Sequence, residues 1–330
     1  MSRFAIGAYS SLALLAGCTS NGVHFAPTAG VPNVRPTHTV AALQPNCCAR
    51  AKIAYVSDAF GGPSFTGAVY AFTFPSGTLL GTLAPPPESF LEVQGLCVDT
   101  GGNLYVANTE KSTVDEFSHS GKFLAALSDP NQYPVACAYD ETTGELAVSN
   151  IIDASGGPGS ISIFKGGTVR HTYYPPNLSR VYFLGYEGRT QALWLDGENS
   201  SGIVQYDKFV NGKFTTVPIT GATIGFPGEV QWSALTKSMN VGGATASGTA
   251  AIFQISNRGK VVGTTLLGCS PSGFCGGGQF FIKGPRVTVT GGSSAAVGTY
   301  AFPAGGKPLT IFQNPGYVEP IGVAVSEKVP

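Results

Sequence analysis

Residues 93–127 read VQGLCVDTGGNLYVANTEKSTVDEFSHSGKFLAAL. Four runs rich in β-branched, aromatic and other apolar residues, at 95–99, 103–108, 113–117 and 122–127, are separated by short polar segments. The segments between the first and second runs and between the third and fourth contain glycine, which supplies the positive φ that tight hairpins need. This stretch therefore predicts four antiparallel strands joined by hairpins.

The same unit recurs along the chain. A short β-rich run ends in a polar residue or glycine six times, with steps of 50, 42, 46, 46 and 48 residues between the ends. These end residues are Asp58, Asn108, Asn150, Asp196, Gly242 and Thr290. A second pair, an apolar residue and an aromatic one three positions later, follows each time: Val69/Phe72, Val114/Phe117, Ile161/Phe164, Ile203/Tyr206, Ala250/Phe253 and Val297/Tyr300. Most aromatic residues, Tyr173 and Tyr174 included, are expected to pack between the units.

A repeat of 40–50 residues with four strands is typical of a β-propeller blade. No apolar period of 3.6 residues extends beyond two turns, so almost no helix is expected. The sequence thus predicts an all-β, six-bladed β-propeller over residues 51–330.

The first unit begins near Ile53 and has no first strand before it. At the other end of the chain, residues 320–326 read PIGVAVS, which aligns with the first strand at 94–99 and has no second strand after it. We therefore expect the C-terminal strand to complete the first blade, which would pair the sheet edges that an open ring leaves exposed.

Residues 93–127 resemble an NHL-type or YVTN-type propeller repeat. The matching residues are Gly95, Val98-Asp99, 102–108 and 114–117, while 134–150 and 321–326 match more loosely. The resemblance implies a six-bladed propeller. Such relatives include scaffolds, sugar-lactone hydrolases and a few lyases, so the fold does not by itself define a function.

The N-terminus is typical of a bacterial lipoprotein signal. Arg3 is followed by an apolar stretch at 4–16 that is too short to span a bilayer. Leu15-Ala16-Gly17-Cys18 resembles a lipobox, which implies cleavage before Cys18 and attachment of acyl chains such as palmitate to its thiol. The alternative is an ordinary signal peptide with a chance cysteine.

The lipobox hypothesis divides the chain into a signal peptide at 1–17, the lipidated Cys18 with a flexible tether up to residue 50, and the propeller at 51–330. Four prolines in the tether favour an extended, solvated segment. The protein is then expected in the bacterial cell envelope, anchored to a membrane by lipid and facing the periplasm or the exterior.

Composition excludes several classes of protein. Lys plus Arg and Asp plus Glu both number 19, so no basic excess exists to bind nucleic acid. Apolar residues make up 43% of the chain, which is enough to build a core and excludes a disordered protein.

Strand direction places the ends of the second strands and the starts of the first strands on one face of the ring. Asp58, Asn108, Asn150 and Asp196 are expected there, with Glu92 and Glu319 three residues before a strand glycine. Such a rim of oxygen ligands could hold Ca²⁺ or another hard cation, or hydrogen-bond the hydroxyls of a saccharide. The alternative is structural, because Asp or Asn after a strand commonly caps its own turn.

The favoured function is a non-catalytic binding or protein-interaction platform with a protein or saccharide ligand, no catalytic residue and no required cofactor. One alternative, which the resemblance implies, is a metal-dependent hydrolase of sugar lactones or similar esters. Lyase relatives would need a histidine base on the same face, and His119 and His171 are expected elsewhere. A purely structural envelope protein is the third hypothesis.

Six cysteines remain beside Cys18, which suits an oxidising compartment. Cys269 and Cys275 flank a short loop and are predicted to form a local disulfide. Cys97 and Cys137 lie on neighbouring first strands, either as buried thiols or as a pair. The pairing of Cys47 and Cys48 stays open, and one alternative is a bond from one of them to Cys97 or Cys137 that ties the tether to the propeller.

Overall fold

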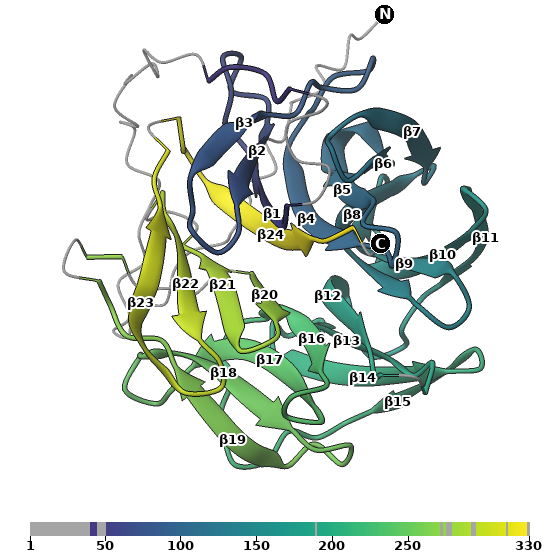
Figure 1. Ribbon diagram of the computed structural model, residues 1–330. Coiled ribbons are helices and arrows are strands. Elements are labelled where there is room, and N and C mark those ends of the chain that lie inside the picture. The colour runs from purple at the N-terminus through teal and green to yellow at the C-terminus, as the bar shows by residue number, and fades with distance from the viewer. Residues whose placement is uncertain are drawn as a thin grey trace, which may run out of the picture.

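The computed structural model describes residues 40–44, 51–188, 190–270, 273–274, 279–291, 295–314 and 316–328. This part of the chain forms six four-stranded antiparallel sheets, here called blades 1 to 6. Figure 1 shows the blades arranged around a central axis, with the first strands of neighbouring blades in contact. The six-bladed β-propeller predicted from the repeats is confirmed, and the described helix is one short 3-10 turn, Thr109–Lys111.

In each blade the first strand named is the innermost, next to the central axis, and the last is the outermost. Blade 1 holds β24 (Pro320–Ser326), β1 (Ile53–Asp58), β2 (Ala68–Thr73) and β3 (Leu79–Thr82). Blade 2 holds β4 (Val93–Val98), β5 (Leu104–Asn108), β6 (Thr113–Phe117) and β7 (Phe123–Ser128). Blade 3 holds β8 (Gln132–Asp140), β9 (Glu145–Asp153), β10 (Ser160–Lys165) and β11 (Thr168–Tyr173).

Blade 4 holds β12 (Arg180–Tyr186), β13 (Leu193–Glu198), β14 (Val204–Val210) and β15 (Lys213–Thr216). Blade 5 holds β16 (Val230–Ser233), β17 (Ser238–Ala244), β18 (Ala250–Ile255) and β19 (Val261–Leu266). Blade 6 holds β20 (Phe280–Lys283), β21 (Arg286–Thr290), β22 (Val297–Ala301) and β23 (Gly305–Phe312).

The C-terminal strand closes the ring as expected. β24 pairs antiparallel with β1, with Tyr55 opposite Ala324 and Val56 opposite Val323. Every residue of β24 is buried. Blade 1 is therefore built from both ends of the propeller, which Figure 1 shows as a yellow strand beside the purple β1.

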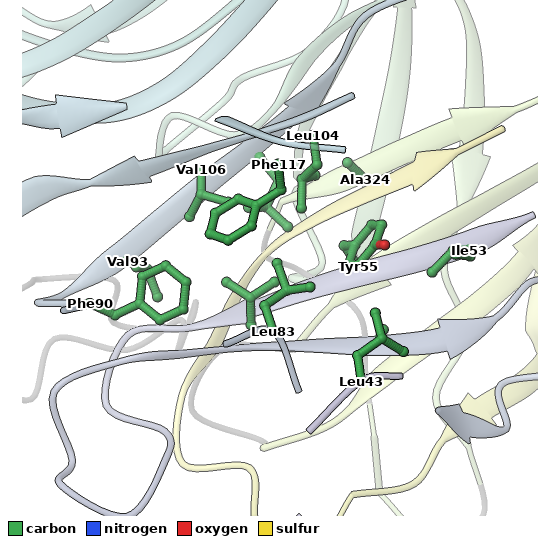
Figure 2. Close-up of a cluster of buried hydrophobic side chains, with 13 residues drawn as sticks. Leu43, Ile53, Tyr55, Leu83, Phe90, Val93, Leu104, Val106, Phe117 and Ala324 are labelled. Atoms are coloured by element: carbon green, nitrogen blue, oxygen red, sulfur yellow. The ribbon is translucent and has the colours of Figure 1, made fainter. Parts of the chain in front are cut away.

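The recurring aromatic residue supplies the core. Phe72, Phe117, Phe164, Tyr206, Phe253 and Tyr300 are all buried on the third strand of their blades. Figure 2 shows Phe117 with Tyr55 and Val106 in the cluster between blades 1 and 2. The apolar partner is less regular, because Ile203 lies in a turn before β14 and is 60% exposed.

Glycines let the innermost strands approach one another. A side chain at Gly95 on β4 would meet the backbone of Val135 and Ala136 on β8. A side chain at Gly322 on β24 would meet Gln94 O on β4 in the same way. These positions therefore need glycine for close backbone contact around the axis.

A disulfide joins two of these strands. Cys97 on β4 and Cys137 on β8 are bonded, with their Cα atoms 5.6 Å apart, and both residues are buried. Of the possibilities that the sequence left open, the pair is the one observed, so the alternative bond from Cys97 or Cys137 to a tether cysteine is wrong. The bond links blade 2 to blade 3 next to the Gly95 contact.

The described end of the expected tether packs on the propeller. Leu43 N donates to Thr82 O at 2.7 Å, and Thr82 N donates to Ala41 O at 3.0 Å, which adds a parallel bridge outside β3. Leu43 is buried in the cluster of Figure 2. Residues 40–44 thus differ from the solvated segment that the prolines suggested, because the apolar Leu43 gains from burial.

The signal peptide, Cys18, Cys47, Cys48 and Cys275 lie outside the described residues. Cys269 is disulfide-bonded. Because Cys275 lies outside the described residues, the bond between Cys269 and Cys275 stays a prediction. Among the described residues no helix is both long and apolar enough to cross a membrane.

Candidate functional site

The face on which the second strands end and the innermost strands begin is here called the top face. Its four predicted rim residues Asp58, Asn108, Asn150 and Asp196 have no exposed surface. They end β1 and β5 or lie within β9 and β13, at equivalent places in blades 1 to 4. Their hydrogen bonds define what each one does.

Asp58 holds the loop that leads into β24. Its carboxylate accepts hydrogen bonds from Val318 N at 2.7 Å and Glu319 N at 2.9 Å, and a third from Phe60 N at 3.2 Å. Burial raises the pKa of Asp58, and these backbone donors oppose that shift. The side chain thus caps the entry to its own blade.

Asn108 plays the same part in blade 2. Its Oδ1 accepts from Leu91 N at 2.8 Å, and its Nδ2 donates to Ser89 O at 3.0 Å and to Asp115 Oδ2 at 2.8 Å. Burial raises the pKa of Asp115 to about 7. All the hydrogen bonds of Asn108 therefore stay within blade 2 and the loop before it.

Asn150 lies in a hydroxyl network in blade 3. Its Nδ2 donates to Ser160 Oγ and Ser162 Oγ, both at 3.1 Å. These hydroxyls donate in turn to Gln132 Oε1 at 2.7 Å and Asp129 Oδ1 at 2.9 Å, next to or within the start of β8. Burial raises the pKa of Asp129 to about 6.

Asp196 joins blade 4 to the entry of blade 5. Its Oδ1 accepts from Phe183 N at 2.8 Å, and a backbone hydrogen bond from Gly228 opposes the rise in its pKa. Burial raises the pKa of Asp196 well above its ordinary value and does the same to the neighbouring Glu229. Glu229 is not among the predicted rim residues, because no motif in the sequence distinguishes it from other acidic loop residues.

Glu92 and Glu319 lie closer to the axis, where the loops enter β4 and β24. Glu92 has a left-handed backbone, φ 56°, and its carboxylate accepts from Gln94 Nε2 at 3.3 Å. Burial raises its pKa to about 7, with further contributions from the negative charges of Glu110 and Glu319. The structure thus brings Glu92 and Glu319 near each other, together with Glu110 from the 3-10 turn.

We expect Glu92→Gln to flatten the pH dependence of stability. The pKa of Glu92 is about 7 in the fold against an ordinary 4.5, so its contribution to stability is complete below pH 4.5 and is lost as the pH rises through 7. Urea unfolding at intervals from pH 5 to 8 would show a smaller loss for the variant. Asp115 and Asp129 titrate in the same direction, so part of the slope should remain. Glu110→Gln is the matched control, which should reduce the slope less. An unchanged slope in Glu92→Gln would contradict this assignment.

The described residues contain no group of three or more His, Cys, Asp or Glu side chains placed to hold a metal ion. Asp58, Asn108, Asn150 and Asp196 each make hydrogen bonds within the loops and strands of the top face, while Asn150 Oδ1 and Asp196 Oδ2 are buried without a hydrogen-bond partner among the described residues. Of the two histidines outside the tether, His119 is buried with its Nδ1 2.6 Å from Ser326 Oγ, and His171 lies exposed on the outer strand β11.

The top face also carries two grooves that the sequence analysis did not predict. They have volumes of about 320 and 580 Å³ and share the side chain of Tyr174. Tyr174, which was expected to pack between blades, is 48% exposed in the loop between β11 and β12. The only sequence signal was the run Tyr173-Tyr174-Pro175-Pro176 itself.

No family model and no curated protein sequence matches the chain. Among solved structures, a chain in the crystal structure of a nidogen/laminin complex is similar, with a TM-score of 0.65 and 11% sequence identity. The similarity covers 84% of this chain and 100% of that chain. At this identity the likeness supports the fold alone.

Proposed function

We propose that the protein is a non-catalytic binding platform whose top-face loops recognise a partner protein at a bacterial envelope membrane. One observation carries the proposal: the polar rim side chains are buried in contacts that fix the loops. Asp58, Asn108 and Asp196 each accept backbone hydrogen bonds from the loop or strand at the entry of their own blade. Rigid loops on a closed scaffold are suited to specific binding.

The solved structural neighbour supports this proposal by analogy. That chain was determined in a nidogen/laminin complex, so its structure is part of a protein assembly. Fold likeness does not transfer a partner, so the proposal rests on the loops of this chain and not on the neighbour's ligand.

Photo-crosslinking tests the platform. A photoreactive amino acid would replace the exposed Phe65 or Ser247 in top-face loops, or the exposed Glu141 or Asn211 in turns of the opposite face. Irradiation of cells should give one common adduct from both top-face positions and none from the other two. Adducts from neither face, or equally from both, would contradict the proposal.

The hydrolase alternative predicts a different result. A bound metal would raise the melting temperature by mass action, so Ca²⁺, Mg²⁺ and EDTA should change the melting of a metal-dependent enzyme. The platform proposal expects no change with any of the three. A shift that Glu92→Gln and Glu319→Gln abolish would favour the hydrolase instead.

We expect Cys18→Ser to release the protein from the membrane. Stable anchoring of a protein to a membrane requires two or more acyl chains. The lipobox hypothesis attaches them at Cys18, through its thiol group. Cell fractionation should move the variant to the soluble fraction, and labelling with a tagged palmitate should be lost. Cys48→Ser is the matched control and should keep both properties. A Cys18→Ser variant that stays membrane-bound would contradict lipid anchoring.

A further inference from the structure

The two grooves around Tyr174 lie between blades 3 and 4. One is lined by Asn131, Gln132, Asp153, Ala154, Ser155 and Tyr174. The other runs along 174–179 to Asn199, Ser200 and Gln205. Each volume is within or close to the range of small-molecule sites, and the shared ring makes them neighbouring parts of one surface.

Backbone contacts hold the first groove in shape. Asp153 Oδ1 accepts from Ser155 N and Gly157 N, both at 2.8 Å, and Ala154 N donates to Asn131 O at 3.0 Å. The hydroxyl of Ser155, which donates to Asp153 Oδ1 at 2.6 Å, and then these backbone donors hold the pKa of Asp153 below its usual value. Gln132 Nε2 donates to the hydroxyl of Tyr174 at 3.4 Å, which orients the shared ring.

The second groove is held in the same way. Ser179 Oγ donates to Glu198 O at 2.9 Å, and Asn199 Oδ1 accepts from Ser201 N and Ile203 N. The walls are thus formed before any ligand arrives, which lowers the entropic cost of binding.

The lining combines polar and apolar groups and is almost uncharged. Amides and hydroxyls of Asn131, Asn177, Ser200 and Gln205 lie among alanine, leucine and proline side chains, and Asp153 is the one carboxylate among the lining residues.

A peptide strand is a poorer fit to this surface. Pro175 and Pro176 form part of the wall and have no N–H to donate to a peptide carbonyl. An exposed aromatic ring flanked by amides and hydroxyls suits a sugar, whose C–H face packs on the ring while its hydroxyls meet the polar groups.

We propose that the paired grooves bind a neutral oligosaccharide, with one sugar ring stacked on Tyr174 and neighbouring units in the grooves on either side. This site lies on blades 3 and 4, and its binding of sugar does not require that another part of the top face binds a protein. An envelope glycan and a free oligosaccharide both present the C–H faces and hydroxyl groups that this site would recognise.

Calorimetric titration of the purified full-length protein with chitohexaose, cellohexaose, maltohexaose and laminarihexaose tests the proposal. At least one should bind, and Tyr174→Ala should weaken that binding roughly tenfold or more. Tyr174→Phe keeps the ring and should bind nearly as well as the unchanged protein. Phe65→Ala, which removes another exposed aromatic side chain of the top face, is the matched control and should have no effect.

Three outcomes would overturn the proposal: no binding of any of the four at millimolar concentration, equal binding by Tyr174→Ala, or binding of a proline-rich peptide through Tyr174 in place of the sugars. Equal melting temperatures of all variants would show that a loss of binding is not a loss of fold. The adducts expected at Phe65 and Ser247 do not depend on Tyr174, so the two proposals fail separately.

Discussion

Deletion of residues 318–330 is expected to leave a propeller that no longer unfolds as one cooperative unit. The deletion removes β24, whose residues are all buried, and uncovers the edge of β1. The burial of Ile321, Val323 and Val325 contributes roughly 1.5–3 kcal/mol each. Their sum is comparable with the stability of about 5–15 kcal/mol that domains usually have.

The lost strand also connects neighbouring blades. Thr290 Oγ1 on β21 donates to Ile321 O at 2.7 Å, and Ser326 Oγ donates to Gly102 O at 2.5 Å in blade 2. Removal of β24 therefore disturbs blades 6 and 2 as well as blade 1. Calorimetry should show a broad, low transition, and limited proteolysis should cut blade 1 first.

Two control proteins distinguish the effect of opening the ring from the effect of merely shortening the chain. Deletion of residues 327–330 removes the tail beyond β24 and should change melting little. A circular permutant with residues 318–328 placed ahead of Lys52 should melt cooperatively, because Ser326 already lies opposite Ile53. A deletion of 318–330 that melts as cooperatively as the full propeller would contradict the closure argument.

The number of blades was predictable because its determinants repeat. Phe72, Phe117 and Tyr300 occupy the same position of three blades and meet the same apolar surroundings, so one recognised unit predicted the others. Closure of the ring was predictable because the first unit lacks a first strand and the C-terminal strand has no second strand after it. The blade number and the closure can both be recognised from short local segments of a single sequence.

The role of the rim was not predictable to the same degree. Asp58 and its partner Val318 are 260 residues apart, so the sequence alone could not distinguish a loop cap from a metal ligand. The exposure of Tyr174 depends on loops of two blades, and the burial of Leu43 depends on the edge of β3. The rim caps, the exposure of Tyr174 and the burial of Leu43 all depend on contacts between segments that are distant in the sequence and have no common sequence motif.

The disulfide between blades 2 and 3 is the other strong determinant of stability. We expect the double variant Cys97→Ala, Cys137→Ala to lower the free energy of unfolding. With a sequence separation of 40, the chain-entropy model predicts a loss of about 4 kcal/mol. Such a loss would lower the melting temperature by about 7 °C. Urea unfolding and calorimetry of the two proteins measure both quantities.

A disulfide stabilises a protein more when it closes a longer loop. A second disulfide with a shorter loop therefore serves as the comparison for the bond between Cys97 and Cys137. Cys269 and Cys275, if paired as predicted, close a loop of a few residues, for which the same model predicts about 2 kcal/mol. Replacing both by alanine should therefore cost less than replacing Cys97 and Cys137. The buried bond should also resist reductant until the protein opens, since both sulfur-bearing residues are almost fully shielded from solvent. If the Cys97→Ala, Cys137→Ala protein unfolds at the same urea concentration as the original, the bond does not constrain the ring and β4 and β8 are held by packing around Gly95 alone.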